Sequence, residues 1–373
     1  MPIPTAKDAK DAKKNLLLIL LWVLCALCCE MLFALPAHAE DVLHLYNWNN
    51  YIAEATLARF EARCHCRVRQ DYYSDNEEML AKLEAGAVGY DLLVPTGNAV
   101  ESLIRRQALR PLDKTKLQHL GNVKREFLDA WYDPGNRYSV PYATTVTLIG
   151  YNADKMRELG LPTDTWALIF EPKYLEKIRG RVTVLNSQRE LLGAAMRYLG
   201  YSVQERDSAR WEAAKRLLIR AKPYWAAFSN STYIKDLAIG NIWVAHGYSN
   251  DMFRAREDAK AAGRPFTIGF TTPKEGAVLA VDNWVLHKSG QRPDLAYQFI
   301  DFMLEGENAA DVSNAIGAGN PNGAAMPYIR RDIADDPAIF PTPAVLGRLE
   351  MLRDFDPKMR RMLSRLWTEI KVR

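Results

Sequence analysis

The feature that most constrains the fold is an alternation of strand-like and helix-like stretches between residues 42 and 104. Three short runs, 42–46, 67–73 and 90–95, are predicted strands because they are rich in apolar or aromatic residues. Each run is followed by a stretch whose apolar residues recur with helical spacing. Helices that connect successive strands are typical of a parallel sheet with right-handed crossovers, so we expect an α/β fold here.

A second α/β set follows further along the chain, between residues 182 and 270. The β-rich run 141–152 that precedes it is too long for one ordinary strand, so we expect it to cross between two lobes. Strand 278–286 is a candidate for the return crossing. The length of 373 residues is too great for one small core and also suggests two domains.

The C-terminal part of the chain is predicted to be helical. The spacing of its apolar residues predicts four helices, over 295–304, 309–316, 344–355 and 359–370.

Residues 1–39 have the pattern of a secretory signal peptide. A polar segment with four lysines precedes the apolar run 16–29, and Ala37-His38-Ala39 is a small-x-small cleavage site. We therefore expect the mature chain to begin at Glu40; the alternative is an uncleaved N-terminal membrane anchor. Cleavage would remove four of 49 basic and three of 45 acidic residues, and a chain so nearly balanced is not expected to bind nucleic acid.

Two cysteines remain after cleavage, Cys64 and Cys66, with His65 between them. In an oxidising compartment two cysteines this close are expected to form a small disulfide ring. The alternative is a metal site, which needs more ligands than this turn offers.

Catalytic motifs give no support for an enzyme. The sequence contains no glycine-rich phosphate loop, no GxSxG and no HExxH. Its histidines are scattered, and only His246, at the end of a predicted strand, is a candidate for a site role. We predict no catalytic residue, no cofactor and no metal.

Polar and aromatic residues recur where predicted strands end. They occur at 48–51, 96–98, 186–190 and 248–251, and Asp282 lies inside an otherwise apolar strand. Because ligands bind at the carboxyl ends of strands in open α/β sheets, these groups predict a cleft. Separate carboxylates and aromatic rings suit an elongated cation, although ordinary core aromatics and a buried capping aspartate are the alternatives.

Several motifs together carry a resemblance to a known family. They are Leu45-Tyr46-Asn47-Trp48-Asn49-Asn50-Tyr51, Asp91-Leu92-Leu93-Val94-Pro95, Ile149-Gly150-Tyr151-Asn152, Pro273-Lys274-Glu275-Gly276 and Asn320-Pro321-Asn322-Gly323-Ala324-Ala325. In this order they resemble the periplasmic polyamine-binding proteins, which are the putrescine and spermidine receptors of ABC importers. The similarity extends from about Val42 to Trp367. It implies a type II periplasmic-binding fold, in which two α/β lobes joined by crossing strands close over the ligand.

The resemblance also implies domain bounds and a binding site. Lobe 1 is expected to comprise 40–143 plus about 280–325, and lobe 2 is expected to comprise 144–279 plus about 326–373. The expected ligand-binding residues are Trp48, Asn49, Asn50, Tyr51, Thr96, Glu190, Tyr248, Asp251 and Asp282.

Four positions depart from the pattern of the family. Asn50 replaces an acid, Ala280 a large aromatic residue and Ala318 a tyrosine, and Asn186 lacks a nearby carboxylate. Fewer charges and rings leave room for a bulkier or differently charged ligand.

The expected function is therefore that of a monomeric periplasmic receptor that binds a polyamine or related amine and delivers it to the permease subunits of an ABC transporter. One alternative keeps the fold and changes the solute to another small cation, such as an amino-acid derivative. Another is a sensor subunit that presents its ligand to a membrane protein.

Overall fold

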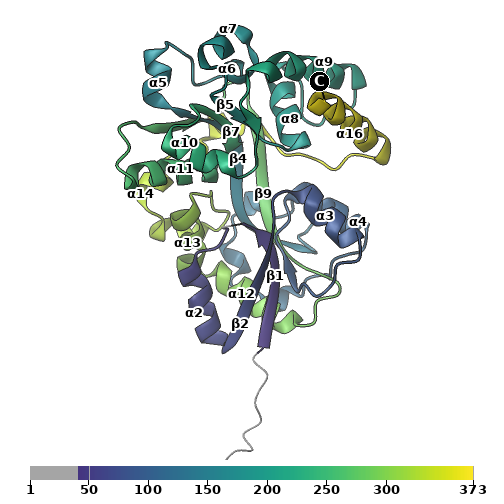
Figure 1. The fold of residues 1–373 in the computed structure, drawn as a ribbon. Coiled ribbons are helices and arrows are strands. Elements are labelled where there is room, and N and C mark those ends of the chain that lie inside the picture. Colours follow the sequence, from purple (N-terminus) through teal and green to yellow (C-terminus); the bar gives the residue numbers. More distant parts are fainter. Residues whose placement is uncertain (1–40, 50, 373) are drawn as a thin grey trace, which may run out of the picture. The chain divides into compact units, whose positions relative to one another are not determined.

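The computed structural model describes residues 41–49 and 51–372 (Figure 1). The expected signal peptide, the expected N-terminal Glu40 and the site residue Asn50 lie outside the described residues. Within the described part of the chain, no helix is both long and apolar enough to cross a membrane.

Eight strands form the continuous path of one mixed sheet, in the order β2-β1-β3-β9-β4-β7-β5-β6, and β8 and β10 pair beside it with β4 and β9. The strands are β1 Asp41–Trp48, β2 Cys66–Tyr73, β3 Leu92–Leu93, β4 Ser139–Asn152, β5 Val182–Val184, β6 Ala227–Phe228, β7 Val244–Tyr248, β8 Ile268–Thr271, β9 Ala277–Leu286 and β10 Leu349–Glu350.

The two longest strands, β4 and β9, lie side by side at the centre of the sheet (Figure 1). They pair antiparallel from Ser139–Val285 to Val146–Leu279, with an irregularity between Pro141 and Ala143. On the β9 side the ladder continues into β3, and the second half of β4 pairs with β7 and β8. The predicted run 141–152 is thus confirmed as one long strand that joins the two α/β sets, and the predicted return strand is confirmed as β9.

Helices connect and cover the strands, as the sequence predicts. The α-helices are α2 Glu54–Cys64, α3 Asn76–Glu84, α4 Gly97–Arg105, α5 Ala153–Glu158, α6 Ala167–Phe170, α7 Pro172–Leu175, α8 Gln188–Tyr198, α9 Ser208–Ala221, α10 Thr232–Ile239, α11 Ser249–Ala261, α12 Pro293–Leu304, α13 Gly306–Ile316, α14 Arg331–Ala334, α15 Pro343–Leu346 and α16 Pro357–Val372. Short 3-10 helices occur at Lys114–Lys116, Leu120–Asn122, Arg125–Phe127, Glu176–Ile178, Lys222–Tyr224 and Gly323–Tyr328.

The predicted helix over 344–355 is wrong. Helix α15 ends at Leu346, and β10 then pairs in parallel with Ala277–Val278 of β9. Residues 351–356 continue without regular secondary structure to α16. Pairing with a neighbouring strand satisfies backbone groups that a helix would satisfy internally, so tertiary context overrides the local helical pattern here.

Each α/β set has its own hydrophobic core. The first core consists of two clusters of residues within 43–143 and 284–318, and the second is one cluster within 146–277 and 338–370. A smaller cluster packs Phe253 of the second set against Ala309 and Ala325. Strands β4 and β9 contribute to both cores. Each set therefore buries its own apolar surface, as expected for two lobes that share a pair of strands.

The predicted disulfide is confirmed at the end of α2. Cys64 and Cys66 are bonded, and His65 between them adopts a left-handed conformation with φ of 52°. Among the described residues, no three His, Cys, Asp or Glu side chains group in a way that could hold a metal ion.

Candidate ligand-binding site

One cavity of about 690 Å³ gathers nearly all of the predicted site residues. Its lining combines β1, β9 and the N-terminal ends of α8 and α11, so groups from both cores face the same space. Eight of the nine predicted residues line it: Trp48, Asn49, Tyr51, Thr96, Glu190, Tyr248, Asp251 and Asp282.

Asp282 provides the most enclosed carboxylate of this cavity. It lies on β9, where neighbouring side chains are buried, and is itself only 3% exposed. The hydroxyl groups of Tyr51 and Thr96 each donate a hydrogen bond of 2.6 Å to one of its oxygens. Burial raises the pKa of Asp282 to about 6, although both hydrogen bonds act to lower it.

Asp251 provides a second carboxylate, in the first turn of α11. The positive end of a helix dipole favours a negative charge at that position. The Tyr233 hydroxyl donates to one oxygen, and Asn250 Nδ2 donates to the other at 3.2 Å. Burial raises the pKa of Asp251 to about 6, opposed by the hydrogen bond from Tyr233.

Glu190 is the third acid, in the first turn of α8. Thr147 of β4 donates a hydrogen bond of 2.6 Å to its Oε2. Burial raises the pKa of Glu190 to about 7, which is higher than that of either aspartate. The negative charge of Glu77 also raises this pKa, whereas the hydrogen bond from Thr147 and the positive charge of Arg189 lower it.

Aromatic rings form a wall beside these acids. Trp48 Nε1 and the Tyr73 hydroxyl both donate to the carbonyl of Val94, at 2.8 and 2.6 Å. The two ring centroids are 4.6 Å apart, and that of Tyr51 is 6.4 Å from that of Trp48. Because their polar edges are hydrogen-bonded or packed, these rings are held in fixed positions.

The sequence interpretation missed one side of the cavity. Asn230, Ser231, Ile234 and Lys235 also line it, around the start of helix α10, which was not predicted. This helix also carries Tyr233, the hydrogen-bond partner of Asp251. The helix itself has a signal in the sequence, because Tyr233, Leu237 and Ala238 recur with helical spacing. The hydrogen bond between Tyr233 and Asp251 has none.

Three other sequence candidates lie away from the cavity. His246 is fully buried, its Nδ1 accepts a hydrogen bond from the Leu185 backbone at 3.3 Å, and burial lowers its pKa to about 3. It is a structural histidine and is not among the residues that line the cavity. Asn186 and Ala318 do not line it either, whereas Ala280 does.

A comparison with models of protein families gives the family of this chain. Residues 55–342 match the model of the bacterial extracellular solute-binding proteins. The chain belongs to this family.

Relatives of this solute-binding protein are similar over most of their length. It is 54% identical to a putrescine/cadaverine-binding protein of Pseudomonas aeruginosa over 343 residues, which cover 92% of this chain and 97% of the relative. It is 35% identical to the putrescine-binding periplasmic protein PotF of Escherichia coli, with 90% and 92% covered.

Solved structures agree with the fold of this solute-binding protein. The spermidine/putrescine ABC transporter substrate-binding protein PotD of Streptococcus pneumoniae aligns with a TM-score of 0.75 and 26% identity. The alignment covers 89% of this chain and 99% of that one. The predicted two-lobed fold of the type II periplasmic binding proteins is therefore confirmed.

Proposed function

We propose that this protein is a periplasmic receptor that binds a polyamine or a related cationic amine and delivers it to an ABC importer. The observation that carries the proposal is the pair Asp251 and Asp282, two separate carboxylates that line one cavity with aromatic rings beside them. The names of the relatives support an amine as the ligand.

The chemistry of the two aspartates suits ammonium groups. A buried carboxylate is costly unless it is paired, and a cation beside it restores the interaction that burial removed. Asn250 Oδ1 is buried beside Asp251 and has no hydrogen-bond partner among the described residues. An ammonium group has three N–H donors and no acceptor, so it can supply both oxygens at this end of the cavity.

Binding is proposed to close two lobes around the ligand. We assign lobe 1 to 40–143 plus about 280–325, and lobe 2 to 144–279 plus about 326–373. Trp48, Tyr51 and Thr96 then come from lobe 1, while Glu190 and Asp251 come from lobe 2. A ligand that contacts both lobes binds the closed state better and shifts the population toward it. Small-angle scattering should therefore give a smaller radius of gyration with ligand; an unchanged radius at saturation would contradict closure.

The cellular setting follows from the same proposal. We infer that the segment 1–39 directs export and is removed, that the mature protein acts as a monomer without catalysis, and that its partners are the permease subunits. The intact mass of the exported protein tests the cleavage, because a chain that retains residues 1–39 would contradict it.

A second candidate keeps the fold and changes the solute to an amino-acid derivative. Two cationic side chains, Lys235 and Arg254, also line the cavity, and they would suit a ligand carboxylate. Arg254 forms an ion pair with Asp258 at 2.9 Å. Lys235 is therefore the more available partner for a ligand carboxylate.

Calorimetry distinguishes the two candidates. Putrescine, cadaverine, spermidine and agmatine should bind, while the corresponding amino acids ornithine and arginine should bind more weakly. Native mass spectrometry of protein purified from the periplasm should find an amine bound. If no amine binds and an amino acid does, the polyamine assignment fails and the solute-binding fold remains.

A further inference from the structure

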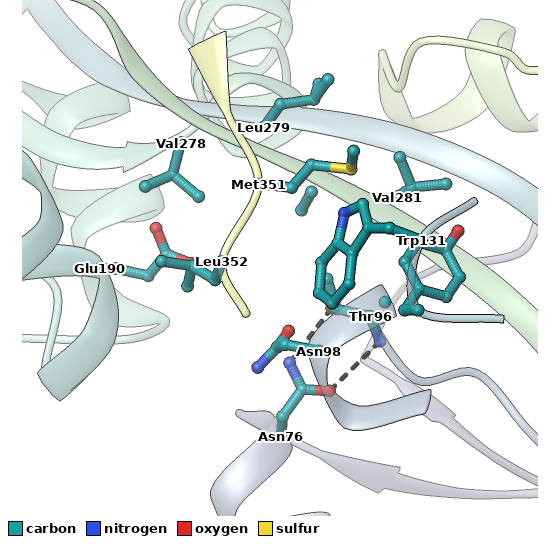
Figure 2. Close-up of a pocket in the computed structure, with 13 residues that line it drawn as sticks. Asn76, Thr96, Asn98, Trp131, Glu190, Val278, Leu279, Val281, Met351 and Leu352 are labelled. Carbon is teal, nitrogen blue, oxygen red and sulfur yellow. Dashed lines mark hydrogen bonds between the residues drawn. The ribbon is translucent and has the colours of Figure 1, made fainter. Parts of the chain in front are cut away.

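Residues 351–356, which link β10 to α16, contact both of the lobes assigned above. We call this segment the strap. Figure 2 shows its first two residues, with Met351 on the side of Trp131 and Leu352 on the side of Glu190. Met351 packs against a hydrophobic cluster of lobe 1, and Leu352 packs in a small cluster with residues of lobe 2. Successive residues thus face different lobes, as successive residues of an extended chain do.

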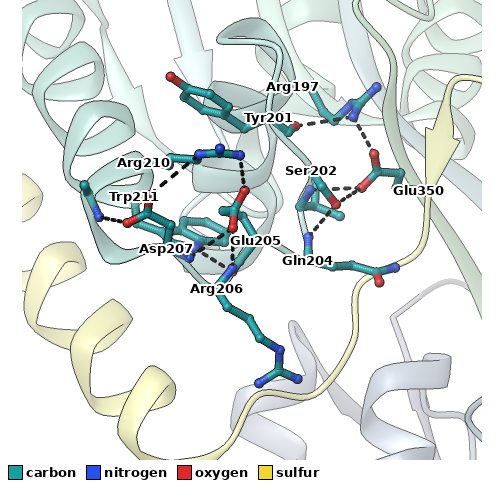
Figure 3. Close-up of polar contacts among 12 residues, drawn as sticks. Arg197, Tyr201, Ser202, Gln204, Glu205, Arg206, Asp207, Arg210, Trp211 and Glu350 are labelled. Carbon is teal, nitrogen blue, oxygen red and sulfur yellow. Dashed lines mark hydrogen bonds and ion pairs between the residues drawn. The ribbon is translucent and has the colours of Figure 1, made fainter.

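The strap is strongly attached to lobe 2 at both ends. Before it, Glu350 of β10 accepts a hydrogen bond of 2.6 Å from Ser202 Oγ and forms an ion pair with Arg197 (Figure 3). At its other end, Phe355 is only 1% exposed and belongs to the core of lobe 2. Because detaching a buried aromatic ring and a hydrogen-bonded strand is costly, the strap should move together with lobe 2.

The contacts of the strap with lobe 1 are weaker and lie nearer the surface. Arg105 of α4 donates a hydrogen bond of 2.7 Å to the Asp354 carboxylate, and the Asp354 backbone N–H donates to Glu101 at 3.0 Å. The guanidinium of Arg353 lies 4.4 Å from the Trp131 ring centroid. The side chain of Arg105 is 48% exposed, and ion pairs and cation–π contacts at exposed sites contribute little individually. These contacts can therefore break while both lobes stay folded.

Two strap residues bind both lobes at once. The Asp354 carboxylate accepts hydrogen bonds from Arg105 of lobe 1 and, at 3.1 Å, from Arg360 of lobe 2. Arg353 directs its guanidinium to a ring of lobe 1, while its carbonyl accepts a hydrogen bond of 2.9 Å from Arg189 of lobe 2. The strap therefore bridges the two lobes through polar contacts that are separate from the ligand site.

We propose that the strap is a latch that holds the two lobes together in the closed state. Arg105 and Trp131 of lobe 1 bind it when the lobes close and release it when they open. A contact made only in the closed state stabilises that state and slows release of the ligand. Arg105, Trp131, Arg353 and Asp354 are not among the residues that line the main cavity, so the latch determines how long an amine is retained and not which amine is bound. This inference rests on the proposed function, because it assumes an amine receptor with two closing lobes.

The test measures how fast putrescine leaves the protein. Arg105→Ala removes the lobe 1 partner of Asp354, and the variant should fold because Arg105 is exposed. Stopped-flow fluorescence should show a dissociation rate constant raised about threefold and an unchanged association rate constant, as expected for the loss of one exposed ion pair. The matched control Arg360→Ala removes the lobe 2 partner of the same carboxylate, so it should release putrescine at the rate of the wild type.

A second variant tests the cation–π contact of the latch. Arg353→Ala should raise the dissociation rate constant about twofold, and the double variant Arg105→Ala, Arg353→Ala should raise it by about fivefold to tenfold. The release of spermidine should accelerate by the same factors as that of putrescine, because the latch does not touch the ligand. A change in the site itself would instead alter the ratio of the two affinities.

The outcomes separate this inference from the proposed function. If putrescine binds the wild type but the double variant releases it at the wild-type rate, the strap is not a latch and this inference alone fails. It also fails if Arg360→Ala accelerates release as much as Arg105→Ala does. If the wild type binds neither putrescine nor spermidine, the proposed function fails and the latch fails with it.

Discussion

The two aspartates of the cavity have similar surroundings, but their hydrogen-bond donors come from very different distances along the sequence. Each accepts a hydrogen bond from a tyrosine hydroxyl, and burial raises the pKa of each to about 6. Asp282 receives its donors from Tyr51 and Thr96, which are 231 and 186 residues away in the sequence. The donors to Asp251, by contrast, are 18 residues and 1 residue away.

This difference indicates how the two ends of the site form. We call the surroundings of Asp282 the Asp282 end and those of Asp251 the Asp251 end. The Asp282 end forms only when β9 pairs with β3 and lies near Tyr51 and Thr96, which are far away in the sequence, and its carboxylate is then almost fully enclosed. The Asp251 end forms from α10 and α11 within one lobe, and Asp251 retains partial exposure. A charge lost from the enclosed end should therefore cost more binding energy than one lost from the open end.

The largest expected effect is that of Asp282→Asn. Breaking a buried charge pair costs roughly 3–5 kcal/mol, so the affinity for putrescine should fall by more than a hundredfold in calorimetry. The unliganded variant should fold, because a neutral amide is less costly to bury than a charge. A loss smaller than tenfold, in a variant whose circular dichroism matches the wild type, would contradict the assignment of Asp282 as the main partner.

Acidification should weaken binding at both ends. A bound cation lowers the pKa of a neighbouring carboxylate, so below about pH 6 the ligand must displace protons from Asp251 and Asp282. From pH 7.5 to pH 5 the affinity should fall by about tenfold for each aspartate. Calorimetry in buffers of different ionisation enthalpy should detect proton release near pH 5.5. An affinity that is constant over this range would contradict the raised pKa values.

Acidification should affect the stability of the unliganded protein in the direction opposite to its effect on binding: the contribution of these two aspartates to folding becomes more favourable as the pH falls. The folded pKa of about 6 exceeds the unfolded value of an aspartate, about 3.9. Between these values the folded state holds protons that the unfolded state has lost, so these two groups favour folding less as the pH rises. The Tm advantage of the double variant Asp251→Asn, Asp282→Asn over the wild type should therefore grow from pH 4 to pH 7. A constant difference would contradict this linkage.

Asp251→Asn sharpens the comparison between the two ends. Its partial exposure lets water replace part of the lost interaction, so we expect a loss of affinity of about tenfold, smaller than that for Asp282→Asn. Tyr233→Phe serves as a control, because it removes the hydroxyl donor and keeps the charge. If Asp251→Asn is the more damaging of the two aspartate variants, enclosure does not determine the strength of each end.

The smallest expected mutational effect is that of Glu190→Gln on a diamine. Putrescine has two charges, which the two aspartates neutralise, so its affinity should change by less than about threefold, or roughly 0.6 kcal/mol. Calorimetry at pH 8, where Glu190 with its pKa of about 7 is ionised, gives the most sensitive measurement. A loss as large as that of Asp251→Asn would place the diamine at Glu190.

Much of this arrangement can be predicted from the sequence, because strand ends are local signals. Trp48, Thr96 and Asp251 follow predicted strands, and the structure brings them to one cavity. Tyr233 was missed, because a hydrogen-bond partner 18 residues away leaves no mark in the sequence around Asp251. Glu350 lies in a segment predicted as helix, and only its pairing beside β9 makes it a strand. Contacts that depend on packing between distant segments are the ones that sequence patterns do not contain.

The enclosure of Asp282 also determines how its interaction with a bound amine depends on salt concentration. Its two carboxylate oxygens accept hydrogen bonds from neutral hydroxyl groups, and only 3% of its surface is exposed. Mobile sodium or potassium ions therefore have little access to this carboxylate. Buried charge pairs are screened much less than exposed ones. The contribution of Asp282 to amine binding should therefore depend little on ionic strength. The factor by which Asp282→Asn weakens putrescine binding is accordingly expected to change only slightly between about 20 mM and about 500 mM sodium chloride, whereas the factor for the partly exposed Asp251 should fall, as titrations of both variants would establish.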